Sequence, residues 1–115
     1  MTIAADRTTW TRVCRTDQLI PERGVAALVG SEPVAVFLLD DGSVRAVGHR
    51  DPFSSANVMA RGIVGSRGDR PTIASPLHKE VYDLGTGECF TDGSLALRTY
   101  RTRIVGGMIE VELDG

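Results

Sequence analysis

Short apolar runs separated by turn residues constrain the fold of this chain more than any other feature of its sequence. Most of the 13 glycines and 5 prolines fall between these runs. The runs span residues 10–14, 24–29, 34–39, 43–47, 63–64, 72–75, 81–84, 101–105 and 108–113. None keeps a helical period over the roughly 11 residues that an amphipathic helix requires. Many short strands with frequent turns predict an all-β fold, a small antiparallel β-sandwich or barrel.

Two pairs of runs are joined by strong hairpin signals. Asp41-Gly42 separates two runs in the first half of the chain, and Gly106-Gly107 separates the last two. Because glycine adopts positive φ freely, the Gly-Gly pair suits a two-residue type I′ turn. Gly85-Thr86-Gly87 predicts a further turn. Residues 16–19 predict a single helical turn, and residues 55–61 predict a short helix.

The length of 115 residues predicts one domain. We expect residues 1–8 to form a flexible leader and residues 9–115 to form the domain. The net charge of -2 gives no basic field for a phosphate backbone, so a nucleic-acid partner is not expected. The apolar runs are far shorter than a membrane span, and the first residues lack the apolar segment of a secretion signal. These features predict a cytoplasmic chain.

The two cysteines, Cys14 and Cys89, have no cysteine or histidine close by in metal-ligand spacing. One disulfide between them is possible by number. In a cytoplasmic chain, we expect two reduced and partly buried thiols instead.

Two loops that follow β runs hold both histidines of the chain. The second loop resembles the Rieske family, since Pro76, His78, the run Tyr82-Asp83-Leu84 and Thr86-Gly87 follow the pattern of its second ligand loop. Rieske domains hold a [2Fe–2S] cluster between one Cys-x-His loop and one Cys-x-x-His loop. The resemblance therefore implies a Rieske-like β-sandwich or barrel with two ligand-type loops.

The resemblance places His49 and His78 at the two histidine positions, but Val47 and Ser75 at the two cysteine positions. Valine cannot ligate iron, and a serine hydroxyl does not replace a thiolate. We therefore expect no cluster in this chain. A single metal on the two histidines would need a further ligand, for which Asp51 or Glu80 is near in sequence. The simpler interpretation is that both histidines make ordinary hydrogen bonds.

A closer resemblance is to the family of small subunits of NAD(P)H-dependent nitrite reductases, which are Rieske-like and lack the cluster cysteines. It is carried by residues 50–58, 61–65 and 74–77 and extends over residues 10–113. It implies a large-subunit partner that carries FAD, a [4Fe–4S] cluster and siroheme and reduces nitrite to ammonium. It implies that this chain, without a catalytic centre, docks on or stabilises that subunit. The contact residues we expect are Arg50, Asp51, Pro52, Phe53, Arg61, Leu77, His78 and Lys79.

Other interpretations stay open at this point. The chain could be a cluster-bearing Rieske ferredoxin that carries electrons to a reductase or an oxygenase, or a free-standing interaction domain. Pro52 and Phe53 could close their loop onto the core, and Arg50 and Asp51 could form a surface ion pair. The glycines at 62, 65 and 68 could simply permit turns. Nucleotide-binding and hydrolase motifs are missing from the sequence.

Overall fold

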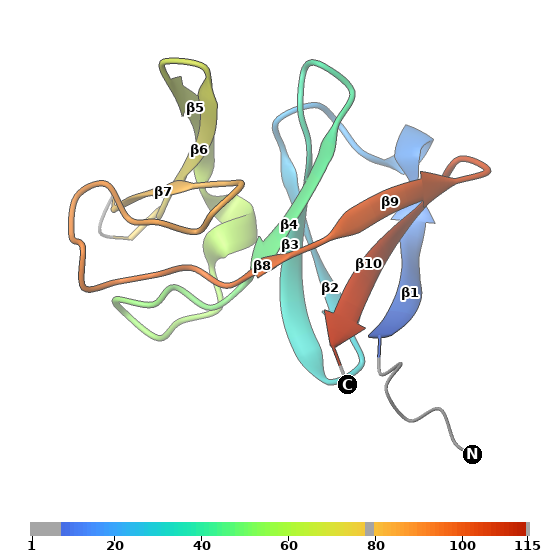
Figure 1. Ribbon diagram of the computed structural model, residues 1–115, viewed down its shortest axis with the longest axis horizontal. Coiled ribbons are helices and arrows are strands. Elements are labelled where there is room, and N and C mark those ends of the chain that lie inside the picture. The colour runs from blue at the N-terminus through green and yellow to red at the C-terminus, as the bar shows by residue number, and fades with distance from the viewer. Residues whose placement is uncertain (1–7, 78–79, 115) are drawn as a thin grey trace.

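The computed structural model describes residues 8–77 and 80–114, and its regular elements in this part of the chain are β-strands and two single turns of 3-10 helix (Figure 1). In chain order they are β1 Thr8–Arg15, η1 Thr16–Gln18, β2 Gly24–Val29, β3 Glu32–Leu38, β4 Val44–Gly48, η2 Met59–Arg61, β5 Ile63–Arg67, β6 Arg70–Ala74, β7 Val81–Asp83, β8 Thr99–Tyr100, β9 Thr102–Val105 and β10 Met108–Asp114. The predicted all-β class is confirmed. In the described residues, no helix is long and apolar enough to cross a membrane.

Three antiparallel sheets form three layers. The sheet β2-β3-β4-β8 lies in the middle, the sheet β1-β10-β9 covers one side, and the sheet β5-β6-β7 covers the other as a separate lobe (Figure 1). Strand β3 is buried on both faces. Val34 and Val36 face one apolar core with Ile109, whereas Ala35 and Phe37 face a second core shared with the lobe. This explains why residues 34–39 read as a continuous apolar run and not as an alternation.

Both predicted hairpins are present. Gly106 and Gly107 join β9 to β10 with φ values of 59° and 80°, as the two central residues of a type I′ turn require. Between β3 and β4, Gly42 has a φ of 87°. The side chain of Asp41 fixes this turn by accepting hydrogen bonds from the backbone and the hydroxyl of Ser43 at 2.9 and 2.6 Å.

The structure differs from the sequence-based prediction at four places. Strand β1 begins at Thr8, inside the expected leader. Strand β3 begins at Glu32, because this residue and the next pair with the end of β2 instead of forming a turn. The helix expected over residues 55–61 is reduced to η2, since Ser55 has a left-handed φ of 67° and Asn57 pairs with Arg50 in an isolated β-bridge. Strand β8 has no apolar run to reveal it.

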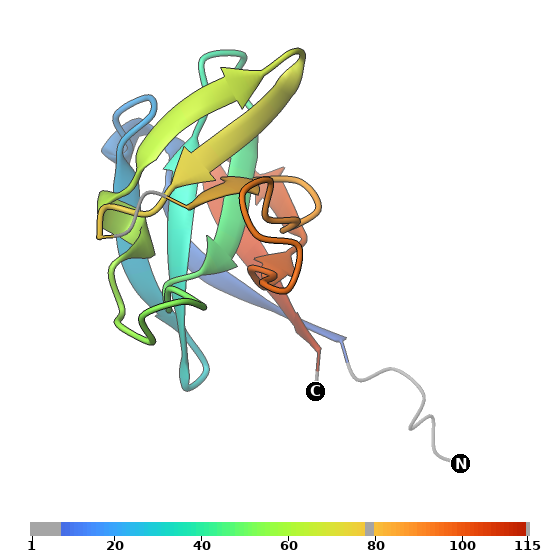
Figure 2. The same ribbon diagram turned by 90° about the vertical axis from the view of Figure 1, so that its left-hand side faces the viewer.

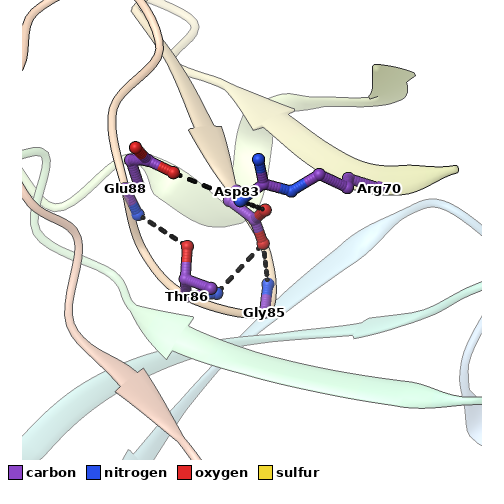
Figure 3. A network of polar contacts seen from close by, with 5 residues as sticks. All are labelled: Arg70, Asp83, Gly85, Thr86 and Glu88. Carbon is purple, nitrogen blue, oxygen red and sulfur yellow. Dashed lines mark hydrogen bonds and ion pairs between the residues drawn. The ribbon is translucent and has the colours of Figure 1, made fainter. Parts of the chain in front are cut away.

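The predicted turn after β7 is confirmed, and Asp83 holds it (Figure 3). Its Oδ1 accepts the backbone N–H groups of Gly85 and Thr86 at 2.6 and 3.0 Å, and its Oδ2 pairs with Arg70 at 2.5 Å. Arg70 also contacts Glu88 at 3.1 Å. Burial raises the pKa of the Asp83 carboxyl, but the backbone donors and Arg70 outweigh this and leave it below its ordinary value. The turn thereby ties β7 to β6.

Both cysteines have free thiols, as expected. Cys89 is buried in the core shared with the lobe, and Cys14 packs at the edge of the other core. Burial raises the pKa of the Cys14 thiol.

Candidate functional site

The two loops that the sequence singled out meet on the lobe side of the central sheet. The first loop, residues 49–58, connects β4 to η2, and the second, residues 75–80, connects β6 to β7. Figures 1 and 2 show the first loop running below the lobe sheet, whose strands β6 and β7 lead into and out of the second. His78 and Lys79 lie outside the described residues.

A buried hydrogen bond between Asp51 and Ser75 joins the two loops. The Ser75 hydroxyl donates to Oδ2 of Asp51 at 2.5 Å, and the two residues are 2% and 0% exposed. Oδ1 of the same carboxylate accepts the backbone N–H of Phe53 at 2.9 Å, and the Ser75 hydroxyl oxygen accepts the N–H of Leu77 at 3.3 Å. The pair therefore fixes the backbone of both loops at once.

The local electrostatics keep Asp51 ionised. Burial raises its pKa, but hydrogen bonds from Ser75, from the Phe53 backbone and from Ser54 lower it further than burial raises it. The net pKa lies below the ordinary value of a carboxyl group. A hydrogen bond to an ionised acceptor is shorter and stronger than one between neutral groups, which fits the short distance to Ser75.

Val47 packs in the core that the central sheet shares with the lobe. It is fully buried in β4, where it pairs with Ala35 of β3 and Thr99 of β8.

His49 accepts hydrogen bonds from the backbone at the end of the first loop and at η2. Its Nδ1 accepts the N–H of Ala60 at 3.1 Å, so the neutral ring carries its proton on Nε2. Its backbone carbonyl accepts N–H groups from Val58 and Met59 at 2.9 and 3.0 Å. Burial lowers the pKa of the imidazole, and the nearby Arg61 lowers it further. His49 therefore orients η2 and the end of the first loop.

These residues do not fit a bridged di-iron cluster. Val47 offers no donor atom, the Ser75 hydroxyl is engaged by Asp51, and one ring nitrogen of His49 is engaged by Ala60. The described residues also contain no group of three or more histidine, cysteine, aspartate and glutamate side chains that could hold a metal ion. Asp51, considered from the sequence as a further metal ligand, is committed to Ser75.

The other expected contact residues lie on the surface. Phe53 and Leu77 are 51% and 50% exposed, so the alternative in which Phe53 closes its loop onto the core is wrong. Arg50 and Arg61 are exposed, and Pro52 is half-buried. Arg50 and Pro52 line a groove of about 470 Å³ between the first loop and the segment that leads into β8. Asp51 makes no ion pair with Arg50 and points inward instead.

The sequence did not reveal that Asp51 and Ser75 are partners. They are separated by 24 positions, and each looks like an ordinary turn residue. The spacing Asp51 to Phe53, typical of a side chain that accepts the N–H group two residues ahead, was the local signal available.

Comparison with known proteins places the chain among related sequences and folds. Residues 9–112 match the family described as the Rieske-like [2Fe-2S] domain. The chain is 33% identical to the small subunit of nitrite reductase (NADH) from Escherichia coli K12 over 103 residues, which cover 89% of this chain and 95% of that protein. It is 31% identical to part of the large subunit of nitrite reductase [NAD(P)H] from Klebsiella oxytoca, covering 89% of this chain and 11% of that protein.

Solved structures agree with this placement. A crystal structure of an NADH-dependent nitrite reductase small subunit from Mycobacterium tuberculosis superposes with a TM-score of 0.92 at 46% identity, covering 96% of this chain and 99% of the other. The ferredoxin of carbazole 1,9a-dioxygenase from Nocardioides aromaticivorans gives a TM-score of 0.78 at 29% identity, covering 90% and 96%.

Proposed function

Because the chain belongs to the Rieske-like [2Fe-2S] domain family and is a homologue of nitrite reductase small subunits, we propose that it is the non-catalytic small subunit of an NAD(P)H-dependent nitrite reductase. This enzyme reduces nitrite to ammonium. The observation that carries the proposal is the end-to-end likeness to such subunits in both sequence and fold. The cytoplasm is the location that the sequence predicts.

The partner in this proposal is the large subunit, to which we assign FAD, siroheme and a [4Fe–4S] cluster. Support comes from the Klebsiella oxytoca large subunit, part of which is similar to nearly the whole of this chain. When the same domain occurs both as a separate chain and as part of a larger one, the separate chain is expected to sit against the corresponding large chain. We therefore propose that this domain docks on the large subunit and stabilises it.

The surface proposed for docking consists of the exposed residues of the two loops and of η2. Phe53 and Leu77 are apolar side chains about half exposed on neighbouring loops, and buried aromatic anchors contribute most to protein interfaces. Arg50 in the first loop and Arg61 in η2 are exposed and positively charged. Asp51 is a positioning residue here, because it fixes the backbone of Phe53 and bonds to the second loop. His78 and Lys79 stay in the proposed set on the sequence alone.

Co-purification tests this proposal. Tagged chain and untagged large subunit are co-expressed, and recovery of the large subunit and its nitrite reduction are measured with wild type, Arg50→Glu and Arg61→Glu. Both variants are expected to recover less large subunit, because rim charges steer association. The matched control is Arg15→Glu, an exposed arginine at the end of β1. Equal recovery with all four proteins would contradict the docking surface, and no recovery with wild type would contradict the partner.

The likeness to a dioxygenase ferredoxin supports a second candidate, a Rieske ferredoxin that carries electrons. The two candidates differ in iron. A ferredoxin isolated without oxygen contains two irons and two acid-labile sulfides per chain, whereas the small-subunit proposal expects neither. The positions of Val47 and Ser75 favour the latter.

A further inference from the structure

Strand β5 is an open sheet edge that the proposed docking loops do not use. It is the end strand of the sheet β5-β6-β7, and in the described residues no other strand pairs with its outer side. The β5–β6 hairpin extends away from the other two sheets (Figure 1). Ile63, at the start of β5, is 72% exposed. An edge strand with a large exposed apolar residue is a ready site for pairing with another chain.

The motif that contains β5 has one glycine that the fold explains and one that it does not. A Cβ on Gly62 would lie 2.5 Å from the carbonyl oxygen of Ala74, so packing excludes any side chain there. A Cβ on Gly65 would meet only the Thr72 hydroxyl at 3.4 Å, which is an ordinary contact. Gly65 also has no left-handed φ. Glycine weakens a strand, and where packing and backbone do not require it, it often marks the close approach of another backbone or a ligand.

The missing side chain opens a groove on the outward face of the lobe sheet. The inward face packs Ile73 and Tyr82 into the core. The outward face carries a groove of about 340 Å³ that Ile63, Gly65, Ala74 and Val81 help to line. A strand added to β5 would place alternate side chains over this groove, since side chains alternate across a sheet.

The charge along this edge is positive. Arg61 precedes β5 and Arg67 ends it. Neither forms an ion pair with a carboxylate in the described part of the chain, and Arg67 instead stacks on the ring of Phe90 at 4.7 Å. Arg70, next to the hairpin turn, is already paired with Asp83 and Glu88. An occupant with acidic side chains would therefore meet two uncompensated arginines.

We propose that β5 receives an extended acidic segment of the large subunit by strand addition, with apolar side chains of that segment seated over Gly65. This inference rests on the proposed function, because it names the part of the partner that binds. It is continuous with the docking loops, since Ile63 pairs with Ala74, the last residue of β6, and the second loop with Leu77 follows directly.

A variant that fills the groove tests the inference without unfolding the domain. Gly65→Val introduces a strand-forming residue where a Cβ fits, so its melting temperature is expected to equal or exceed that of wild type. Affinity for the purified holo large subunit, measured by biolayer interferometry, is expected to fall about tenfold or more because the groove is occupied. The matched control is Gly93→Val, at a glycine with no atom within 4 Å of the added Cβ, which should bind as wild type does.

A second variant covers the case in which Gly65→Val lowers the melting temperature. Arg67→Glu reverses a surface charge and removes the stacking of Arg67 on Phe90, so its melting temperature is measured as well. It should weaken binding more at low than at high salt. Wild-type affinity for both variants would overturn the inference while leaving the docking loops intact, provided that Arg50→Glu still binds weakly. Absence of binding by wild type would instead overturn the proposed function. Sedimentation of the isolated chain tests a further occupant. If the isolated chain dimerises, and Gly65→Val abolishes the dimer but not the binding of the large subunit, the occupant of β5 is a second copy and the inference is overturned.

Discussion

The buried hydrogen bond between the loops makes a quantitative prediction for Ser75→Ala. A hydrogen bond to a charged group contributes about 1.5–3 kcal/mol, and here its loss leaves one oxygen of a buried carboxylate without its donor. We expect the free energy of unfolding to fall by about 2–3 kcal/mol. For a domain of this size, that corresponds to a fall in melting temperature of about 10 °C. Urea unfolding at pH 7, followed by the fluorescence of Trp10 and by circular dichroism, measures it.

A double-mutant cycle separates this bond from other losses. Asp51→Asn keeps an acceptor for the Phe53 N–H but removes the charge, so Ser75→Ala should cost only about 1 kcal/mol in that background. The matched control is Ser94→Ala, whose hydroxyl donates to Asp92 at 2.6 Å on the exposed surface and whose loss should have little effect. If Ser75→Ala unfolds at the same urea concentration as Ser94→Ala, the reasoning is refuted.

The same pair predicts how stability depends on pH. The folded pKa of Asp51 lies below its unfolded value. The contribution of the Asp51 carboxylate to the free energy of unfolding is therefore present above the unfolded pKa of about 3.9 and is lost as the pH falls through the folded pKa. The stability difference between wild type and Ser75→Ala should therefore shrink on acidification. A difference that stays constant down to the acid transition would argue against an ionised acceptor.

Three further predictions follow from the geometry. The folded pKa of His49 lies below its unfolded value of about 6.5, so the contribution of His49 to stability is present above that value and is lost as the pH falls toward the folded pKa. NMR titration should therefore find the midpoint of His49 below about 6.5. A midpoint above about 6.5 would contradict the hydrogen bond from the Ala60 N–H to the His49 ring. Gly24→Ala should lower the free energy of unfolding in urea by about 3 kcal/mol or more, because the added Cβ would lie 2.3 Å from the Ala60 carbonyl oxygen. Stability near that of wild type would show instead that η2 moves freely. Asp83→Ala should cost about 2 kcal/mol or more and expose the turn at Gly85 to hydrogen exchange, and unchanged protection of the Gly85 amide would count against that carboxylate as the anchor.

Local patterns in the sequence predict the strands and hairpins well, because their causes are local. Gly106-Gly107 needs only two residues with positive φ, and the structure supplies both. Strand β8 was not predicted because two residues leave no periodicity, and its pairing with β4 is a property of the whole sheet. The expected helix does not start at Ser55, because this residue has a left-handed φ and Asn57 pairs with Arg50, and the good helix formers in this range did not reveal either feature.

The site could be predicted only where residue type determined chemistry. Val47 and Ser75 exclude two thiolates by their identity, and no structure is needed for that step. The inward turn of Asp51 was not predictable, since an aspartate beside an arginine in a loop usually faces water. Its partner lies in another loop, and pairings of that kind depend on how β4 and β6 are placed. His78 and Lys79 lie outside the described residues, so their expected contacts stay predictions.

The hydrogen bond between Asp51 and Ser75 also determines which conditions can separate the two loops. Loops joined through an iron–sulfur cluster lose their link when the cluster is destroyed or its iron is removed by a chelator. Loops joined by a carboxylate and a hydroxyl separate when the carboxylate takes up a proton. The two loops should therefore stay joined under conditions that would strip the cluster from an iron-bearing relative, and acidification is the perturbation to which they should respond.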